Sequence, residues 1–221
     1  ALLTMMAFAY LQHRRLRCLF GAFAYSGQVC VSVQRIYVVT DIYDEFVRRF
    51  VEQTVALRGG DSLEEEADFS AMVHPKQTER VLAWIGEALD QGAKLACGGE
   101  LMGRMLLPTV LTHVPREAKI AREEVFGPVV MINPVQSVQQ AIRLVNDSRY
   151  GLQAGVYTNN LSLALEAADE LRVGGVIIND IPTFRVDHMP FGGVKESGLG
   201  REGVACAVEE LSELKLVVVK R

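Results

Sequence analysis

Apolar and polar positions alternate along the chain with two different periods from residue 33 onward. In residues 41–58, apolar side chains recur every three or four positions, which is the spacing of one face of a helix. The run before it, VQRIYVVT at 33–40, is short and β-branched, as in a buried strand. The second half repeats this rhythm, with strands expected at 129–135, 152–158 and 174–180 and helices at 137–147 and 160–171. Such alternation predicts an α/β fold, a mainly parallel open sheet with helices on both faces.

Turn-forming residues mark where these elements begin and end. Asp41 is expected to be the N-cap of the first of these helices. Pro75 is suited to the first turn of another helix, which Gly92 then ends. A further strand is expected at 107–114 and a final helix at about 201–211.

The chain ends in the run LKLVVVKR, residues 214–221, which is almost entirely β-branched or apolar before two cations. A strand at a terminus invites unwanted pairing unless a sheet accepts it. Two arrangements are open at this point. The run either forms an edge strand of the same sheet or pairs across a subunit interface.

The first residues form an apolar run, ALLTMMAFAYL, followed by the basic segment 13–17. A secretory signal has the opposite order, and a transmembrane helix needs about 20 apolar residues. A targeting presequence is disfavoured because the segment contains no Ser. We expect an internal helix that truncation has placed at the start.

The composition narrows the possible functions. Of the 221 residues, 49% are hydrophobic and 23% are charged, which predicts a well-buried core. A net charge of −4 without a Lys/Arg cluster argues against nucleic acid as a partner, and no segment suits a membrane. The four cysteines lack C-x-x-C spacing, which favours a reducing compartment. We therefore expect a cytoplasmic protein.

Cys30 is a candidate nucleophile because it lies where a helix-compatible stretch ends and a strand begins. A thiol in such a turn faces a cleft without obstruction, as nucleophilic catalysis requires. From the residues alone, packing as a small hydrophobe is the commoner role of a free cysteine. Both interpretations stay open at this point. The remaining cysteines, Cys18, Cys97 and Cys206, are weaker candidates.

Other chemical motifs are weak or missing. Residues 198–203 fit G-x-G-x-x-G, but the preceding strand ends near Asp180 and no acidic residue can follow about 20 positions later. We expect these glycines to permit tight backbone turns instead. The four histidines are far apart in sequence and show no metal-ligand spacing, so no metal site is predicted. A P-loop and a G-x-S-x-G elbow are also missing.

Four segments taken together resemble the catalytic part of the aldehyde dehydrogenase superfamily, in the same order and at similar spacing. They are GQVCVSVQRIYV at 27–38, EEVFGPVV at 123–130, NDSRYGLQAGVYT at 146–158 and PFGGVKESGLGREG at 190–203. The resemblance covers about residues 20–221 and identifies Cys30 as the nucleophile. It implies that the protein is an NAD(P)-dependent enzyme, which oxidises a small aldehyde to a carboxylic acid through a cysteine thiohemiacetal and a thioester.

The resemblance also implies roles for other residues. Glu124 would hold the nicotinamide ribose and Phe126 would pack near the nicotinamide of NAD or NADP, with Gln77 and Phe191 as further cofactor-side contacts. Substrate choice would be shaped by Val29, Val31, Ser32 and the loop 183–185. Arg185 at the pocket mouth suits a substrate carboxylate or phosphate. A contact with a backbone carbonyl or with an interface is equally open for Arg185.

By the same resemblance the chain divides into an atypical linker or truncation remnant at 1–19, the catalytic domain at 20–211 and an oligomerisation strand at 212–221. That strand implies a homo-oligomer. The family also uses an Asn that holds the oxyanion, a Glu base in an E-L-G-G motif and a Rossmann-type domain. The 221 residues contain none of these three, so we expect poor activity from the chain alone. The alternatives are a non-catalytic α/β fragment and a CoA-acylating or phosphate-reducing relative.

Overall fold

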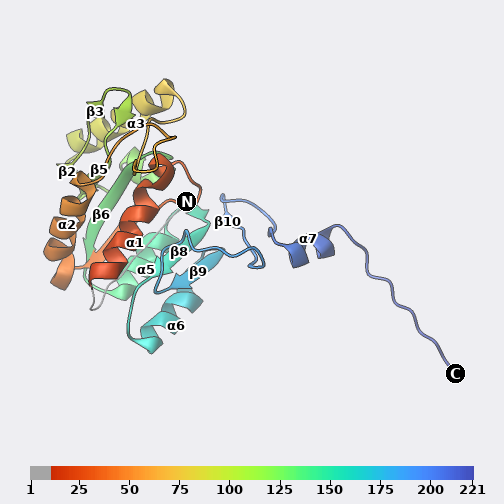
Figure 1. The fold of residues 1–221 in the computed structure, drawn as a ribbon. Coiled ribbons are helices and arrows are strands. Elements are labelled where there is room, and N and C mark those ends of the chain that lie inside the picture. The colour runs from red at the N-terminus through yellow and green to blue at the C-terminus, as the bar shows by residue number, and fades with distance from the viewer. Residues whose placement is uncertain (1–10) are drawn as a thin grey trace.

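The structure, a computed structural model, describes the backbone of residues 11–221 and the side chains from Arg17 onward. Helices and strands alternate along most of this length (Figure 1). The helices are α1 (Leu11–Phe23), the 3-10 helix η1 (Ala24–Gly27), α2 (Thr40–Val55), α3 (Pro75–Asp90), α4 (Lys119–Arg122), α5 (Val138–Asn146), α6 (Leu161–Glu170) and α7 (Val204–Glu210). The strands are β1 (Arg35–Val39), β2 (Lys94–Cys97), β3 (Leu101–Met102), β4 (Met105–Leu106), β5 (Thr109–Thr112), β6 (Val129–Val135), β7 (Tyr150–Gly151), β8 (Gln153–Val156), β9 (Gly175–Ile178) and β10 (Val194–Lys195).

The main sheet has the strand order β1-β6-β5-β2. β6 pairs in parallel with both β1 and β5, and only the edge strand β2 runs antiparallel. A second parallel pair is formed by β8 and β9, while β7 with β10 and β3 with β4 are short antiparallel pairs. The predicted α/β class with a mainly parallel sheet is confirmed.

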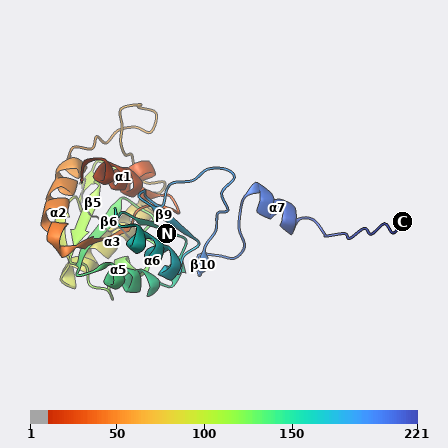
Figure 2. The same cartoon turned by 90° about the horizontal axis from the view of Figure 1, so that it is seen from below.

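Helices cover both faces of the sheet, as Figures 1 and 2 show. All five residues of β1 are buried, as expected for a strand with helices on either side. On one face, Phe23 of α1 and Phe46 and Phe50 of α2 pack with Ile36 and Val38. The opposite face is covered by α3 and α4 over one part of the sheet and by α5 and α6 over another. The core is thus the apolar stripe of each helix pressed on strands that are buried on both sides.

The boundaries differ from the sequence predictions in instructive places. The prediction of Asp41 as an N-cap is wrong, because β1 runs directly into α2 and Val39 is the N-cap, without a side-chain hydrogen bond. Asp41 instead lies in the first turn, where its charge favours the helix dipole. Pro75 does begin α3, and the strand expected at 107–114 is the shorter β5.

The start of the described chain is continuous with the core. The linker expected at 1–19 lies outside the described residues up to residue 10. From there α1 crosses the boundary expected between residues 19 and 20, and Cys18 and Leu19 are buried in the core. The domain division itself stays a prediction.

The C-terminal segment leaves the body of the molecule, with α7 and the tail after it pointing outward in Figures 1 and 2. α7 buries none of its residues, and residues 212–221 are exposed and form no strand within the chain. The predicted edge strand of the same sheet is therefore not formed, and pairing with a second subunit stays a prediction. Within residues 11–221, no helix combines the length and apolarity that a membrane crossing requires.

Candidate active site

Cys30 lies in a tight turn between α1 and β1. After α1 ends at Phe23, the backbone of η1 turns through φ values of 53° at Tyr25, 55° at Ser26 and 67° at Gly27. A second turn follows, in which the Ser32 amide donates to the Val29 carbonyl at 2.9 Å. Cys30 occupies this turn and is exposed. The turn thus presents its thiol to solvent on a short, sharply folded segment.

The other cysteines have different surroundings. Cys18 is fully buried in the core, and burial is the main cause of its strongly raised thiol pKa. Burial also raises the pKa of Cys97 to about 11. Both thiols are therefore protonated and weakly nucleophilic at neutral pH. Cys30 is exposed to solvent and Cys206 is half-buried.

Contacts with α1 hold the Cys30 turn in place. The Ser32 hydroxyl donates to the carbonyls of Gly21 at 3.3 Å and Ala22 at 3.4 Å, and the Val33 amide donates to Gly21 at 2.8 Å. Gly21 admits this approach because a Cβ there would lie 2.6 Å from a Val33 methyl. The predicted substrate contacts Val29 and Val31 are half-buried, whereas Ser32 is buried and its hydroxyl is engaged with the helix. Their roles toward a substrate stay predictions.

The EEVFGP loop, residues 123–128, packs against the Cys30 turn. A Cβ on Gly27 would lie 2.1 Å from the Gly127 carbonyl oxygen, so the two backbones touch directly. A cavity of only about 10 Å³ between the two segments is lined by Val29, Ser32, Glu124 and Phe126, among others. Phe126 has φ 49° and keeps 41% of its surface exposed. The loop that carries Glu124 and this accessible ring is therefore packed against the turn that carries Cys30.

Gln34 ties this loop to β1, a role that the sequence motifs do not predict. Its amide nitrogen donates to the carbonyls of Ile120 at 3.1 Å and Glu123 at 2.7 Å. Its amide oxygen accepts from the Val125 amide at 3.0 Å. The available signal was a Gln inside a run, VSVQRIYV, that reads as a buried strand. A buried amide in such a run requires partners.

Gln77 is connected to the same loop through Arg80. The exposed Gln77 side chain accepts from Arg80 Nε at 2.7 Å, and Arg80 Nη2 donates to the Val125 carbonyl at 2.6 Å. Burial lowers the pKa of Arg80, and the charge of Glu124 opposes that shift. α3 therefore brings Gln77 to the loop that carries Glu124 and Phe126, although its contact with a cofactor stays a prediction.

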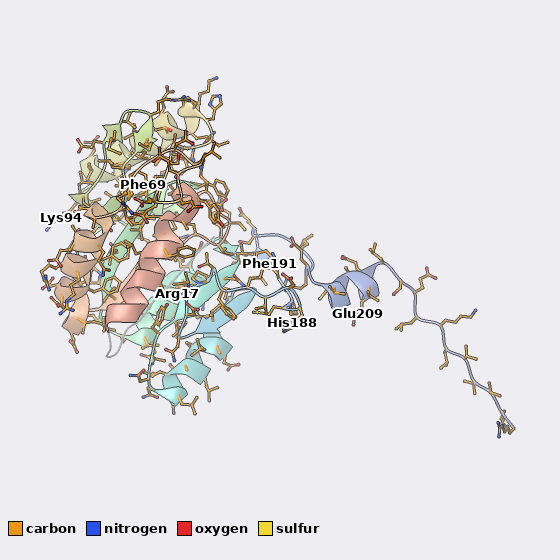
Figure 3. The ribbon with its side chains drawn as sticks, in the orientation of Figure 1. Arg17, Phe69, Lys94, His188, Phe191 and Glu209 are labelled. Atoms are coloured by element: carbon orange, nitrogen blue, oxygen red, sulfur yellow. The ribbon has the colours of Figure 1, made fainter. Side chains whose placement is uncertain are left out.

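Arg185 and Phe191 form a separate cluster with Glu202. Phe191 is buried, and its backbone exchanges hydrogen bonds of 2.9 and 2.6 Å with Glu202. The Arg185 guanidinium lies 4.2 Å above the Phe191 ring and 3.3 Å from the Glu202 carboxylate. In Figure 3, Phe191 lies between the body and α7. Neither Arg185 nor Phe191 lines the cavity beside Cys30.

The glycines of residues 198–203 serve backbone turns, as predicted. Gly198, Gly200 and Gly203 have φ values of 123°, 71° and 127°, a region in which other residues are strained. The last of them precedes the short helix α7 and not a nucleotide-binding helix after a strand.

Arg149 joins three of the four sequence motifs. Its guanidinium lies 2.5 Å from the carboxylate of Glu123 and 3.4 Å from that of Glu196. These residues belong to the segments 146–158, 123–130 and 190–203. Gln34 connects the fourth segment, 27–38, to the same loop. The four motifs, far apart in sequence, therefore form one connected region of the folded chain.

A sequence model described as "Aldehyde dehydrogenase family" matches residues 5–217. The chain belongs to the aldehyde dehydrogenase family. The match covers all four motifs and extends over α1, which the resemblance from residue 20 had left out.

Similar members of the aldehyde dehydrogenase family are known from sequence and from structure. A 3-sulfolactaldehyde dehydrogenase of Priestia megaterium is 48% identical over 198 residues, which are 90% of this chain and 42% of that protein. Aldehyde dehydrogenase 21 of Physcomitrella patens, solved with the reaction product succinate, has a TM-score of 0.95 at 36% identity and covers 99% of this chain and 46% of its own. The glyceraldehyde-3-phosphate dehydrogenase GapN of Methanocaldococcus jannaschii, solved with NADP, has a TM-score of 0.94 at 37% identity, covering 100% and 48%. This chain thus spans less than half the length of these relatives.

Proposed function

We propose that this chain is the cysteine-bearing catalytic part of an NAD(P)-dependent aldehyde dehydrogenase, with Cys30 as its nucleophile. The observation that carries the proposal is the exposed Cys30 thiol on a turn packed against the loop of Glu124 and Phe126. Family membership adds weight, because aldehyde dehydrogenases cover the whole described fold. The division into a linker at 1–19 and a catalytic domain at 20–211 is part of the same proposal.

The chemistry begins at the sulfur of Cys30. Its thiolate attacks the aldehyde carbon, the carbonyl π electrons move to oxygen, and protonation gives a thiohemiacetal. The carbon then loses a hydride and the hydroxyl a proton, which leaves a thioester. Water adds to the thioester, the C–S bond breaks, and the carboxylic acid and the Cys30 thiol are released. Sulfur suits both steps because it is a strong nucleophile and a good leaving group.

NAD or NADP, when bound, supplies the hydride acceptor. The loop packed against the Cys30 turn suits such a group in its chemistry, because Glu124 offers a carboxylate and Phe126 keeps 41% of its surface exposed. Glu124 would accept hydrogen bonds from ribose hydroxyls, and Gln77 lies at the same loop through Arg80. Phe191, under the Arg185 guanidinium, is proposed as a further cofactor-side contact from the segment 190–203.

The substrate we propose is a small aldehyde that carries an anionic group. Arg185 supports this, since its guanidinium is held over Phe191 and keeps 43% of its side-chain surface exposed. An incoming carboxylate, sulfonate or phosphate would replace Glu202 as its partner. The names of two relatives are consistent with an anionic substrate, since 3-sulfolactaldehyde carries a sulfonate and succinate carries carboxylates.

Alkylation of Cys30 tests the nucleophile without requiring turnover. Iodoacetamide at neutral pH, followed by peptide mass analysis, is expected to modify Cys30 before Cys206, Cys97 and Cys18. Equal rates at Cys30 and Cys206 would contradict an activated site.

To test the charge of the substrate, alkylation by the anionic reagent iodoacetate is compared with alkylation by neutral iodoacetamide. Arg185→Gln is expected to lower the iodoacetate-to-iodoacetamide rate ratio at Cys30, whereas Arg172→Gln on the exposed surface leaves it unchanged.

Turnover of the 221 residues alone is expected to be slow, because the family's oxyanion Asn, its Glu base and most of its NAD(P) contacts are not in this sequence. NADH or NADPH formation with a panel of aldehydes measures this, with Cys30→Ser as the blank. Robust turnover would refute the expectation.

The compartment proposed for the protein is the reducing cytoplasm, because its cysteines lack the spacing of a disulfide framework.

The tail at 212–221 is proposed to pair with a second subunit. Its apolar side chains are almost fully exposed, with Leu214, Leu216 and Val219 all above 80%. A β-branched run that pairs with none of the described strands is suited to strand addition. Light scattering of the chain and of a version that ends at residue 211 tests this, and equal masses would contradict it.

A further inference from the structure

A polar cavity on the α4 and α5 side of the sheet has no part in the chemistry proposed above. It measures about 360 Å³ and lies over β1 and β6, between α4 and the end of α5. Four arginines line it: Arg35, Arg116, Arg122 and Arg149. Neither Cys30 nor Glu124 is among its lining residues. A cavity of this size accommodates a small ligand.

Arg35 is the unusual member of this group. Only 7% of its surface is exposed, and its Nε is buried without a hydrogen-bond partner in the described chain. Its Nη2 donates a long hydrogen bond to Ser148 Oγ at 3.4 Å. Burial lowers the pKa of Arg35 to about 10, which shows how poorly the protein alone replaces water around this charge. A buried guanidinium normally has an anionic partner.

The charges in the cavity wall do not balance. Arg116 pairs with Asp147, and Arg149 pairs with Glu123. These are the two carboxylates among the lining residues, against four guanidinium groups, so the wall carries a net charge of about +2. Arg122 is exposed on α4 beside this wall. Glu196, outside the lining residues, lies 3.4 Å from Arg149 and offsets part of this excess, so between one and two positive charges remain for a ligand.

We propose that this cavity binds a small dianionic phosphoryl group, either inorganic phosphate or a phosphate monoester. A dianion matches the excess charge of the wall, and guanidinium forks suit phosphate oxygens in geometry. The phosphoryl oxygens would accept the Arg35 Nε proton that has no other partner. Arg149 connects the cavity to the EEVFGP loop, since it also holds Glu123 next to Glu124.

Isothermal titration of the chain with inorganic phosphate and with phenyl phosphate, at constant ionic strength in chloride, tests the proposal. One saturable site is expected. Arg122→Gln is expected to weaken binding about tenfold, the usual scale of one charge-assisted contact. Arg35→Lys keeps the charge but loses the fork and is also expected to weaken binding. Arg104→Gln, an exposed arginine in the loop between β3 and β4, is the matched control and is expected to bind normally.

Three results would overturn the proposal: no saturable binding at millimolar phosphate or ester, unchanged affinity in Arg122→Gln, or the same loss in Arg104→Gln. Circular dichroism and thermal unfolding in chloride alone establish that each variant is folded. If Arg35→Lys does not fold, Arg122→Gln decides the outcome. Tighter binding of the ester than of phosphate identifies an organic phosphate as the ligand, and the reverse order identifies free phosphate.

Discussion

Replacing Gln34 by Leu removes the side chain that fastens the EEVFGP loop to β1. Leu keeps a similar volume but makes no hydrogen bond. The change deletes two bonds to the carbonyls of Ile120 and Glu123 and one from the Val125 amide. Gln34 is only 5% exposed, so water does not readily replace these partners. The variant therefore tests whether one buried amide holds the loop of Glu124.

The expected loss of stability follows from these contacts. Each intramolecular hydrogen bond contributes about 1 kcal/mol net, and leaving its partner buried and unpaired costs about 1–3 kcal/mol. The added apolar surface of Leu offsets part of this loss. We expect the free energy of unfolding to fall by about 3 kcal/mol, which is a large part of a typical total of about 5–15 kcal/mol.

Urea unfolding, followed by circular dichroism and by the fluorescence of Trp84, measures this difference. Gln139→Leu is the matched control, because Gln139 makes one partly buried hydrogen bond, to Glu166 at 2.7 Å. The control is expected to lose about 1 kcal/mol or less. If Gln34→Leu loses no more than Gln139→Leu, the loop does not depend on Gln34 and the reasoning is refuted.

Two further changes probe the Cys30 turn and a buried thiol. Gly27→Ala places a Cβ 2.1 Å from the Gly127 oxygen on a residue with φ 67°. Urea unfolding is therefore expected to show that the free energy of unfolding falls by more than about 2 kcal/mol. The control Gly86→Ala, in α3 with free space around it, is expected to raise that free energy by about 0.5–1 kcal/mol. Equal effects would contradict this. Burial raises the pKa of Cys97 from 9.0 to about 11, so its contribution to stability is full below pH 9 and is lost as the pH rises to 11. Cys97→Ala is expected to flatten that decline in unfolding free energy, and an unchanged slope would refute it.

The fold was predictable wherever the local pattern was strong. The strand expected at 129–135 is β6, and the helix expected at 160–171 is α6 within one residue at each end. Both have a clear period and clear turn residues on either side. The strands β2, β3 and β4 were not predicted, because glycines at 98, 99 and 103 interrupt the short apolar runs of residues 94–106. The tail at 212–221 has the composition of a strand but pairs with no strand in residues 11–221.

The sequence motifs named candidate site residues, whereas the packing that joins their segments could not be predicted. The fold packs the turn of Cys30 against the loop of Glu124 and Phe126, and the roles of these three residues stay predictions. The roles of Gln34 and Arg149 were hidden, since the bonds of Gln34 to this loop span 86 to 91 positions and each partner alone resembles an ordinary polar residue. Hydrogen bonds over such separations are fixed by packing and have no local signature.

The shape of the Cys30 turn depends on chain segments outside the cysteine motif. Tyr25 and Ser26 adopt left-handed backbone conformations, which cost about 1–2 kcal/mol each for residues other than glycine. Hydrogen bonds to the loop 70–73 stabilise these strained backbone conformations. Ser26 Oγ donates to the Ser70 carbonyl at 2.7 Å and accepts from its amide at 3.1 Å, while Gln28 Oε1 accepts from the Val73 amide at 3.0 Å.

Strain of this kind persists only where surrounding structure over-determines the backbone, and such places are often functional. Here α1 holds the turn through Ser32, the loop 70–73 holds it through Ser26, and the EEVFGP loop touches it at Gly27. If Cys30 is the nucleophile proposed above, a turn held from three sides needs little reorganisation to present it to a substrate. The position of Cys30 is thus a property of the folded chain as a whole, and any change that releases one of these contacts is expected to alter its alkylation rate.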